Sequence, residues 1–170
     1  PAQAPVLATA NAIADALIDR LGPEIRLALP LGLGKPVTLV DALTNAVAKR
    51  PEIRLSILTA LTLEPPEAGS GMARRFLDPA RERLFGAYPV PDYARRLRAG
   101  DLPPNIEVSE FFMLAGRWLG VEAAQRRYIA ANYTHALDVV RRWRPNLVLQ
   151  LVAEEESGAL NLACNADITA

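Results

Sequence analysis

The chain has 170 residues, a formal net charge of zero and 51% hydrophobic residues. This composition is typical of a folded globular domain and argues against intrinsic disorder, and the balanced charge gives no reason to expect nucleic acid or an anionic membrane as a partner. A single cysteine excludes an internal disulfide, and the apolar stretches are too short to span a bilayer. No signal peptide is expected in residues 1–5, so we expect a cytoplasmic location.

The first third of the sequence predicts a helix followed by a β-α-β unit. Apolar residues recur near every 3.6 positions over residues 9–21, and Gly22 follows as a stop signal. A strand is expected over residues 25–29, then a helix over 38–50 that Pro51 ends. A second strand is expected over 53–61, where polar and apolar residues alternate before the run becomes fully apolar. We therefore expect the two strands to pair in parallel, with a right-handed crossover through the helix.

A loop rich in proline, glycine and serine covers residues 64–71 and leads into a basic region over 72–99. We expect short helical pieces there, interrupted by Pro79 and two later prolines. Seven arginines lie in this region: Arg74, Arg75, Arg81, Arg83, Arg95, Arg96 and Arg98. Such a group can bind a phosphorylated ligand, but it more often forms a solvated face. We favour the solvated face, because nearby carboxylates offset part of the charge.

The second half of the chain predicts further strands and helices in alternation. Strands are expected over residues 106–112, 128–131, 147–153 and 160–164, and helices over 121–127 and 133–144, with Thr134 as the N-cap of the last helix. Strands that alternate with helices indicate an α/β domain with a mostly parallel open sheet and flanking helices. We expect residues 1–170 to form a single domain of this class.

The segment 25–40 gives the clearest indication of a site, because a glycine loop follows the first strand and a helix begins directly after it. Gly32 and Gly34 lack Cβ atoms, so the chain there can adopt positive φ and a ligand can approach the backbone. Open α/β sheets bind ligands at the carboxyl ends of their strands, and free N–H groups at a helix start favour an anion or an oxyanion. The alternative is a tight turn without a ligand.

Polar residues at two other predicted strand ends are candidate neighbours of this loop. Glu110 lies beside two aromatic residues, where burial would raise its pKa and suit it to acid–base chemistry; the alternative is a surface or helix-start glutamate. Residues 132–135 form a second polar strand-to-helix turn, which the same rule places at the same sheet edge. His135 and Cys164 could form a nucleophilic pair, although a structural histidine and a buried apolar cysteine are commoner. Metal-ligand spacing is absent from the sequence, so we expect no metal site.

Several short sequence motifs follow one another along the chain in a fixed order. They are residues 32–36, 39–43, 59–65, 75–77, 83–89, 92–93, 98–105, 108–112, 132–135 and 164–167. Taken together, this ordered set resembles the acetyl-CoA hydrolase/CoA-transferase family, from about residue 25 to the end of the chain. Each segment is short, and the order in which they occur makes the set specific.

The resemblance implies two similar α/β domains with an active site between them, and a reaction that cleaves or transfers a CoA thioester. In the transferases a glutamate attacks the acyl-CoA carbonyl, so that an acyl-glutamyl anhydride and then a glutamyl-CoA thioester form. Water in place of the acceptor acid gives hydrolysis. That glutamate lies in the second domain of the family, so this chain corresponds to the N-terminal domain and we expect no catalytic residue in it.

The resemblance also implies a substrate or oxyanion pocket, whose expected lining is Gly32, Gly34, Lys35, Pro36, Glu110, Asn132, Tyr133 and His135. The glycine backbone would supply donors, and Lys35 would attract a carboxylate or the CoA phosphates, unless it is a solvated loop lysine. A CoA thioester is the expected substrate, with no permanently bound cofactor. The expected partners are acyl-CoA, a small carboxylate, a C-terminal domain and a second copy in a homo-oligomer. The alternative is a non-catalytic module that binds CoA or assembles with a partner subunit.

Overall fold

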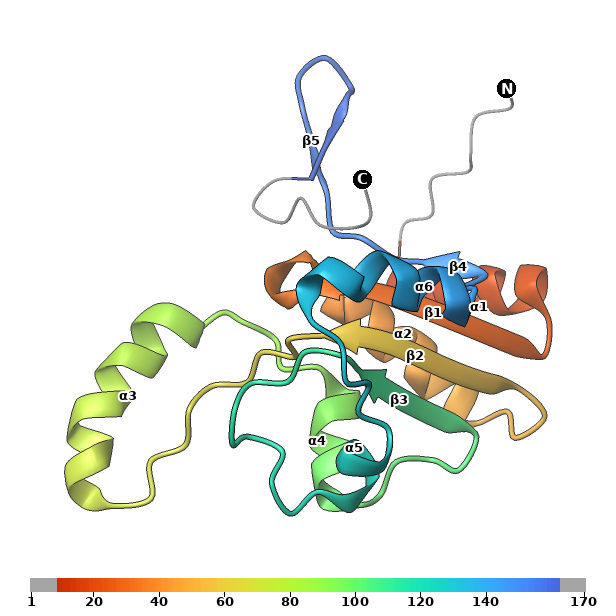
Figure 1. Cartoon of the computed structure of the whole chain (residues 1–170). Helices are drawn as coiled ribbons and strands as arrows, with labels where there is room; N and C mark the ends of the chain where they lie inside the picture. The colour runs from red at the N-terminus through yellow and green to blue at the C-terminus, as the bar shows by residue number, and fades with distance from the viewer. Residues whose placement is uncertain (1–8, 163–170) are drawn as a thin grey trace.

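A parallel sheet forms the centre of the molecule in the computed structural model, which describes residues 9–162 (Figure 1). Within these residues its strands are β1 (Glu24–Leu31), β2 (Arg54–Ala60), β3 (Ile106–Glu110) and β4 (Leu147–Val148), in the order β3-β2-β1-β4. Every neighbouring pair is parallel. The predicted α/β class and parallel sheet are therefore confirmed.

Helices α1 (Ala10–Leu21), α2 (Val37–Ala48) and α4 (Asp92–Ala99) cover one face of this sheet. The predicted first helix is confirmed, because the Thr9 hydroxyl accepts from the Ala12 N–H as an N-cap and Gly22 ends the helix at φ 75°. Helix α6 (Ala136–Trp143) lies on the opposite face, where Ala136 packs against Ala60. Helix α5 (Glu122–Arg126) lies beside β3.

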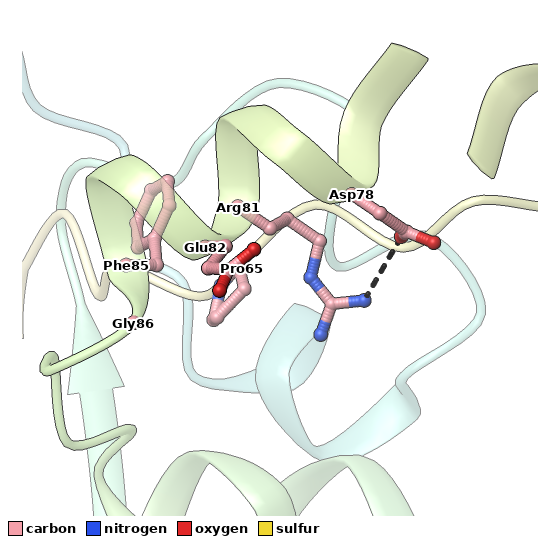
Figure 2. A pocket seen from close by; sticks show the side chains of 6 residues that line it. All are labelled: Pro65, Asp78, Arg81, Glu82, Phe85 and Gly86. Atoms are coloured by element: carbon pink, nitrogen blue, oxygen red, sulfur yellow. Dashed lines mark ion pairs between the residues drawn. The ribbon is translucent and has the colours of Figure 1, made fainter. Parts of the chain in front are cut away.

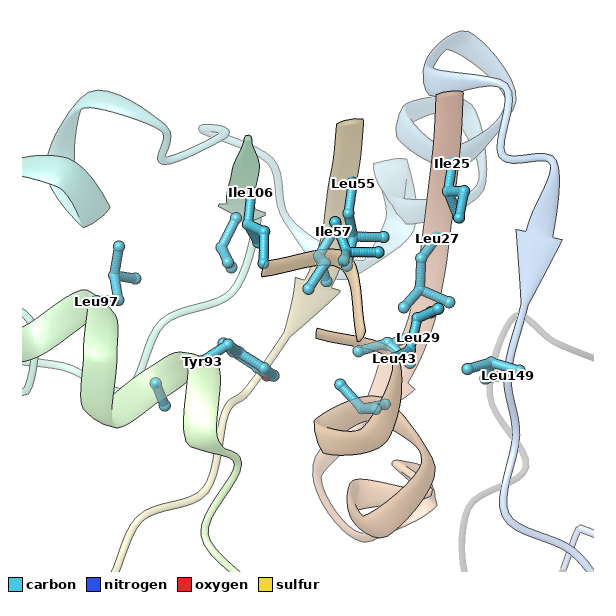
Figure 3. Close-up of a cluster of buried hydrophobic side chains, with 14 of the residues drawn as sticks. Ile25, Leu27, Leu29, Leu43, Leu55, Ile57, Tyr93, Leu97, Ile106 and Leu149 are labelled. Carbon is cyan, nitrogen blue, oxygen red and sulfur yellow. The ribbon is translucent and has the colours of Figure 1, made fainter. Parts of the chain in front are cut away.

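The core lies between the sheet and the helices α1, α2 and α4. Leu55 and Ile57 of β2 stand opposite Ile106 and Val108 of β3 in the strand pairing, and these side chains point to the same face. Figure 3 shows how the alternate apolar residues of β1 continue this layer. The last four residues of β2, Ile57–Ala60, are all buried, because both sheet faces are covered there. The predicted change from alternation to a fully apolar run is confirmed.

The basic region over 72–99 forms two helices, which the segment with Pro89 and Pro91 separates as expected, but no interruption is found at Pro79. Helix α3 (Gly71–Phe85) begins at Ser70, whose hydroxyl accepts from the Ala73 N–H, and it continues through Pro79. A proline removes one helical donor and crowds the preceding turn, but its fixed φ is itself helical. In the part of the chain that the structure describes, none of the α3 side chains is buried, and Figure 1 shows the helix standing away from the sheet.

Several predictions for the second half are wrong in extent. The expected strand over 128–131 is a single bridge between Tyr128 and Glu110. The expected helix over 133–144 divides into a 3₁₀ turn η2 (Tyr133–His135) and α6, and Thr134 is not an N-cap, because its hydroxyl donates to the side chain of Asn132. The strand expected over 147–153 ends at Val148, which pairs with Ala28, and β1 itself is irregular beyond that residue, between Ala28 and Leu31.

Beyond β4 the chain forms a hairpin of β5 (Ala153–Glu154) and β6 (Leu160–Asn161), which pair antiparallel. The expected last strand over 160–164 is thus shorter within the described residues, and Cys164 lies outside them. The hairpin extends away from the sheet in Figure 1, and both of its strands are exposed.

One asparagine joins three elements at the amino-terminal edge of the sheet. The Asn105 side-chain amide donates to the carbonyls of Val47, Arg50 and Ile53, at 2.9, 3.1 and 2.9 Å. It therefore ties the end of α2 and the start of β2 to the loop before β3. In addition, the Leu55 N–H donates to the Asn105 carbonyl.

We predict that Asn105→Ala lowers the free energy of unfolding by about 2 kcal/mol, because half-buried carbonyls lose their donor. Urea denaturation followed by circular dichroism measures the change. Asn11→Ala, on the exposed side of α1, is the control and should remain within about 0.5 kcal/mol of the parent. Equal stability of the two variants would contradict the anchoring role of Asn105.

Candidate functional site

Strands β1 and β2 are each followed directly by a residue with left-handed backbone. Gly32 has φ 47° and Leu61 has φ 44°. Their backbones are joined, because the Gly32 N–H donates to the Leu61 carbonyl at 3.2 Å, and the Leu61 N–H donates to the Phe112 carbonyl at 2.7 Å. Positive φ in a leucine is strained, and such strain is typical of functional sites. The carboxyl edge of the sheet is therefore the candidate location of a functional site.

Lys35 lies inside this edge. Its side chain is buried, and its Nζ donates to the Ala60 carbonyl at 2.6 Å and to the Leu61 carbonyl at 3.2 Å. These bonds hold the turn after β1 against the end of β2. The expectation of a solvated loop lysine is wrong, and the ammonium group that was expected to attract a carboxylate substrate is bound to the backbone.

Glu110, the last residue of β3, is also buried, so the expectation of a surface glutamate is wrong. Its carboxylate accepts from the Thr62 N–H at 2.7 Å and from the Thr62 hydroxyl at 3.3 Å. Burial raises the pKa of Glu110, while the bonds from Thr62 and the charge of Lys35 oppose that rise. The effect of burial is the largest of these, so the pKa of Glu110 lies above its ordinary value.

Tyr93 of α4 closes this group from the helix side. Its hydroxyl lies 3.0 Å from the Thr62 hydroxyl, and burial raises the pKa of Tyr93 far above its ordinary value. We call Lys35, Thr62, Tyr93 and Glu110 the buried polar cluster. All four are at most 3% exposed. The cluster is therefore closed off from solvent in this structure, and its hydrogen bonds support the carboxyl edge of the sheet.

Sequence reasoning selected two members of the cluster and missed Thr62 and Tyr93. Both lie in segments quoted for the family resemblance. Thr62 is a hydroxyl residue between two leucines, a setting that could have pointed to it, because a buried hydroxyl needs a hydrogen-bond partner. Tyr93 stands beside Asp92, and its sequence neighbours give no such signal.

The glycine loop differs from the expectation of free donors. It forms a 3₁₀ turn η1 (Gly32–Gly34), in which both glycines are buried. The Gly32 N–H is paired with Leu61, and the Gly34 carbonyl accepts from the Leu151 N–H at 2.8 Å. Positive φ is found at Gly32 and not at Gly34. The exposed tip of the turn is Leu33, so a ligand at this edge meets a leucine side chain first.

The helix after this turn also offers fewer free groups than expected. The N–H groups of Val37, Leu39 and Val40 donate to the carbonyls of Lys35 and Pro36. Pro36 is the N-cap residue of α2 and makes no side-chain cap bond. The start of α2 is therefore largely satisfied by its own turn, which removes the main reason to expect an anion there.

Asn132, Tyr133 and His135 lie in the exposed turn η2. Ala136 follows and packs on the face that carries Ala60, whereas Glu110 points to the opposite face of the sheet. The topological rule therefore places the three polar residues at the predicted edge, but on the other side of the sheet from Lys35 and Glu110. The pairing of His135 with Cys164 stays a prediction, because Cys164 is outside the described residues.

Among residues 9–162, no group of three or more His, Cys, Asp or Glu side chains is placed to hold a metal ion. In the same part of the chain, no helix is both long and apolar enough to cross a bilayer. Comparison of the chain with protein-family profiles, with curated proteins and with solved structures finds no match.

We predict that Glu110→Gln becomes more stable relative to the parent as the pH rises. The folded pKa of Glu110 is raised above its ordinary value of 4.5, so the folded state binds more protons than the unfolded state between the two pKa values. The stability that the protonated Glu110 side chain contributes is fully present below pH 4.5 and is lost as the pH rises through the pKa of the folded state. Glutamine keeps the acceptor for Thr62 and does not ionise.

Urea denaturation at a series of pH values from 4 to 8 measures this difference in free energy. Glu52→Gln, on the exposed turn before β2, controls for the loss of one carboxylate. A stability difference between Glu110→Gln and the parent that stays constant with pH would show that Glu110 does not titrate abnormally.

We predict that Lys35→Met lowers the free energy of unfolding by at least about 2 kcal/mol at neutral pH, because two buried carbonyls lose a donor and Glu110 loses its cation. The double variant Lys35→Met/Glu110→Gln should cost less than the sum of the single variants, by roughly 1 kcal/mol. Lys49→Met, at the exposed end of α2, is the control. Additive effects would show that the two charges do not interact.

Proposed function

We propose that this chain is the N-terminal domain of an enzyme that acts on a CoA thioester, of the acetyl-CoA hydrolase or acyl-CoA:carboxylate CoA-transferase kind. The attacking glutamate belongs to a second domain and lies outside this chain. The proposal rests on the ordered sequence segments, since the comparisons with known proteins supply no relative.

The observation that carries the proposal is that segments distant in sequence, each quoted for the resemblance, are bonded to one another. Lys35 of segment 32–36 donates to segment 59–65. Thr62 of that segment joins Glu110 of segment 108–112 and Tyr93 of segment 92–93. These contacts support the proposal because the quoted segments form a connected hydrogen-bonded group in the folded chain.

Two further segments make the same kind of contact. The Asp41 carboxylate accepts from the Asp92 N–H at 2.9 Å and so caps α4, whose own N-cap residue is Pro91. Asn105, the last residue of segment 98–105, joins α2 to β2 as described above. The quoted residues therefore build the framework on which the turns at the carboxyl edge are held.

In this proposal the chain supplies one wall of the acyl site, and the second domain supplies the chemistry. The glutamate carboxylate attacks the thioester carbonyl, and the CoA thiolate leaves as the acyl-glutamyl anhydride forms. The thiolate then attacks the glutamyl carbonyl, which releases the acid and leaves a glutamyl-CoA thioester. The acceptor carboxylate attacks the glutamyl-CoA carbonyl and displaces the thiolate, which then attacks the acyl carbonyl of the new anhydride, so that the new acyl-CoA leaves and the glutamate is regenerated. Water in place of the acceptor hydrolyses the glutamyl-CoA thioester to glutamate and free CoA. The buried polar cluster holds the turn that carries Leu33 at the edge, where Leu33 would face the substrate.

The second candidate function is a non-catalytic module that binds CoA or assembles with a partner subunit. It is favoured by the exposed apolar side chains on the two projecting parts of the molecule. Helix α3 exposes Met72, Phe76 and Leu84, and the hairpin exposes Leu160. Exposed apolar groups of this kind are typical of surfaces that pack against another domain or subunit.

We predict that the 170-residue chain binds acetyl-CoA but does not turn it over, with or without acetate or succinate. Calorimetry measures binding, and the release of free thiol measures turnover. Leu33→Asp should weaken binding of acetyl-CoA at least fivefold, because it places a like charge beside the anionic ligand at the exposed tip of η1. Asn11→Ala on α1 is the matched surface control and should bind as the parent does.

Failure of the parent chain to bind acetyl-CoA would contradict the proposal. Robust turnover by this chain would contradict the placement of the nucleophile outside it. Binding of acetyl-CoA by a longer protein that contains this chain, without any turnover, would favour the second candidate function.

A further inference from the structure

A cavity of about 470 Å³ lies between α3, α4 and the loops that follow β2 and β3. Its volume is within the range of small-molecule sites. Arginines from three different elements converge on it, and the charged residues of its lining are Arg81, Arg95, Arg98, Arg117, Glu64 and Glu67.

Arg98 is fixed in one orientation by three kinds of contact. Its guanidinium binds the Glu64 carboxylate through Nε at 3.3 Å and Nη2 at 2.5 Å, and Nη1 donates to the Arg117 carbonyl at 2.8 Å. Its plane lies over the Trp118 ring, with the central carbon 4.4 Å from the ring centroid. The Glu64 charge is thereby neutralised, and the cavity wall is rigid at this point.

The other three arginines are weakly neutralised. Arg117 donates from Nη2 to the Pro65 carbonyl at 3.1 Å and forms no ion pair with a carboxylate in the described part of the chain. Arg81 is 3.9 Å from Asp78, too far for a hydrogen bond. Arg95 contacts Asp92, but that carboxylate also binds Arg96. Glu67 is the one lining carboxylate left to oppose them among residues 9–162.

We propose that this cavity binds a multiply charged phosphate group, such as the diphosphate of a nucleotide-like ligand. Guanidinium groups bind phosphate oxygens in pairs through parallel N–H groups, and like charges facing one another across a cavity repel until an anion lies between them. Arg81 on α3 and Arg95 on α4 would both contact the ligand. This inference rests on the arginines, not on the proposed thioester chemistry.

A neighbouring cavity of about 520 Å³ indicates on which side of α3 the phosphate binds. It shares Arg81 and Pro65 with the arginine cavity, but Asp78 and Glu82 line it (Figure 2). Figure 2 shows the Arg81 guanidinium beside Asp78. Two carboxylates repel phosphate, so the anion belongs on the α4 side, and Arg81 would turn from Asp78 toward it.

We predict that inorganic pyrophosphate binds the complete chain and that Arg81→Gln/Arg117→Gln weakens this binding at least tenfold. Calorimetry at low salt measures the affinity, and added salt should weaken the binding by the parent chain. Arg81→Gln alone should show part of the loss, and its exposed side chain makes it safe for folding. Arg74→Gln, on α3 and outside both cavity linings, is the matched control.

Circular dichroism is used to check that each variant is folded. Lack of pyrophosphate binding by the parent, or equal binding by the parent and the folded double variant, would overturn the proposal. Competition then identifies the source of the phosphate: displacement of pyrophosphate by CoA assigns the cavity to CoA, and displacement by ADP alone assigns it to another nucleotide. If the parent chain binds pyrophosphate but not acetyl-CoA, the proposed function is contradicted and this inference stands.

Discussion

The ammonium group of Lys35 is the point on which the carboxyl edge of the sheet depends. Two adjacent parallel strands both leave the sheet there, and the carbonyls of Ala60 and Leu61 lie where the regular strand pairing of β2 ends. Lys35 reaches from the turn after β1 and donates to both of these carbonyls. A lysine can do this because its long stem crosses the space between the turns, while its head supplies several donors.

This arrangement explains why a charged pair is present in a place with little water. Burying an ammonium group is unfavourable unless carbonyls or a carboxylate compensate it. The carbonyls satisfy its hydrogens, and Glu110 supplies negative charge nearby, as the effect of Lys35 on the pKa of Glu110 indicates. Thr62 then satisfies the carboxylate. Lys35 therefore needs the charge of Glu110, and Glu110 needs the donors of Thr62. Substitution of one member of the buried polar cluster should affect the others.

The sequence predicted β1 and β2 well because these two strands are the longest of the sheet, are mainly apolar and lie close to their helices in the sequence. Residues 53–61 show both the alternation and the fully buried end that β2 has. The site was predicted less well, because residue spacing places side chains at an edge but does not say which face they use. Glu110 and His135 are at the same edge, and a difference in strand and turn geometry puts them on opposite faces. Lys35 looked like a loop residue, since nothing local shows that distant carbonyls need a donor.

Helix α3 has a consequence for the dynamics of the molecule. A helix of 15 residues with no buried side chain gains little stability from tertiary packing, and Pro79 removes one of its hydrogen bonds. Because its side chains contribute nothing to the core, α3 can unfold and refold without disturbing the sheet, so its amide hydrogens should exchange with solvent far faster than those of β1 or β2. We therefore expect a partner that contacts α3 to change the amide exchange of that helix before that of the sheet.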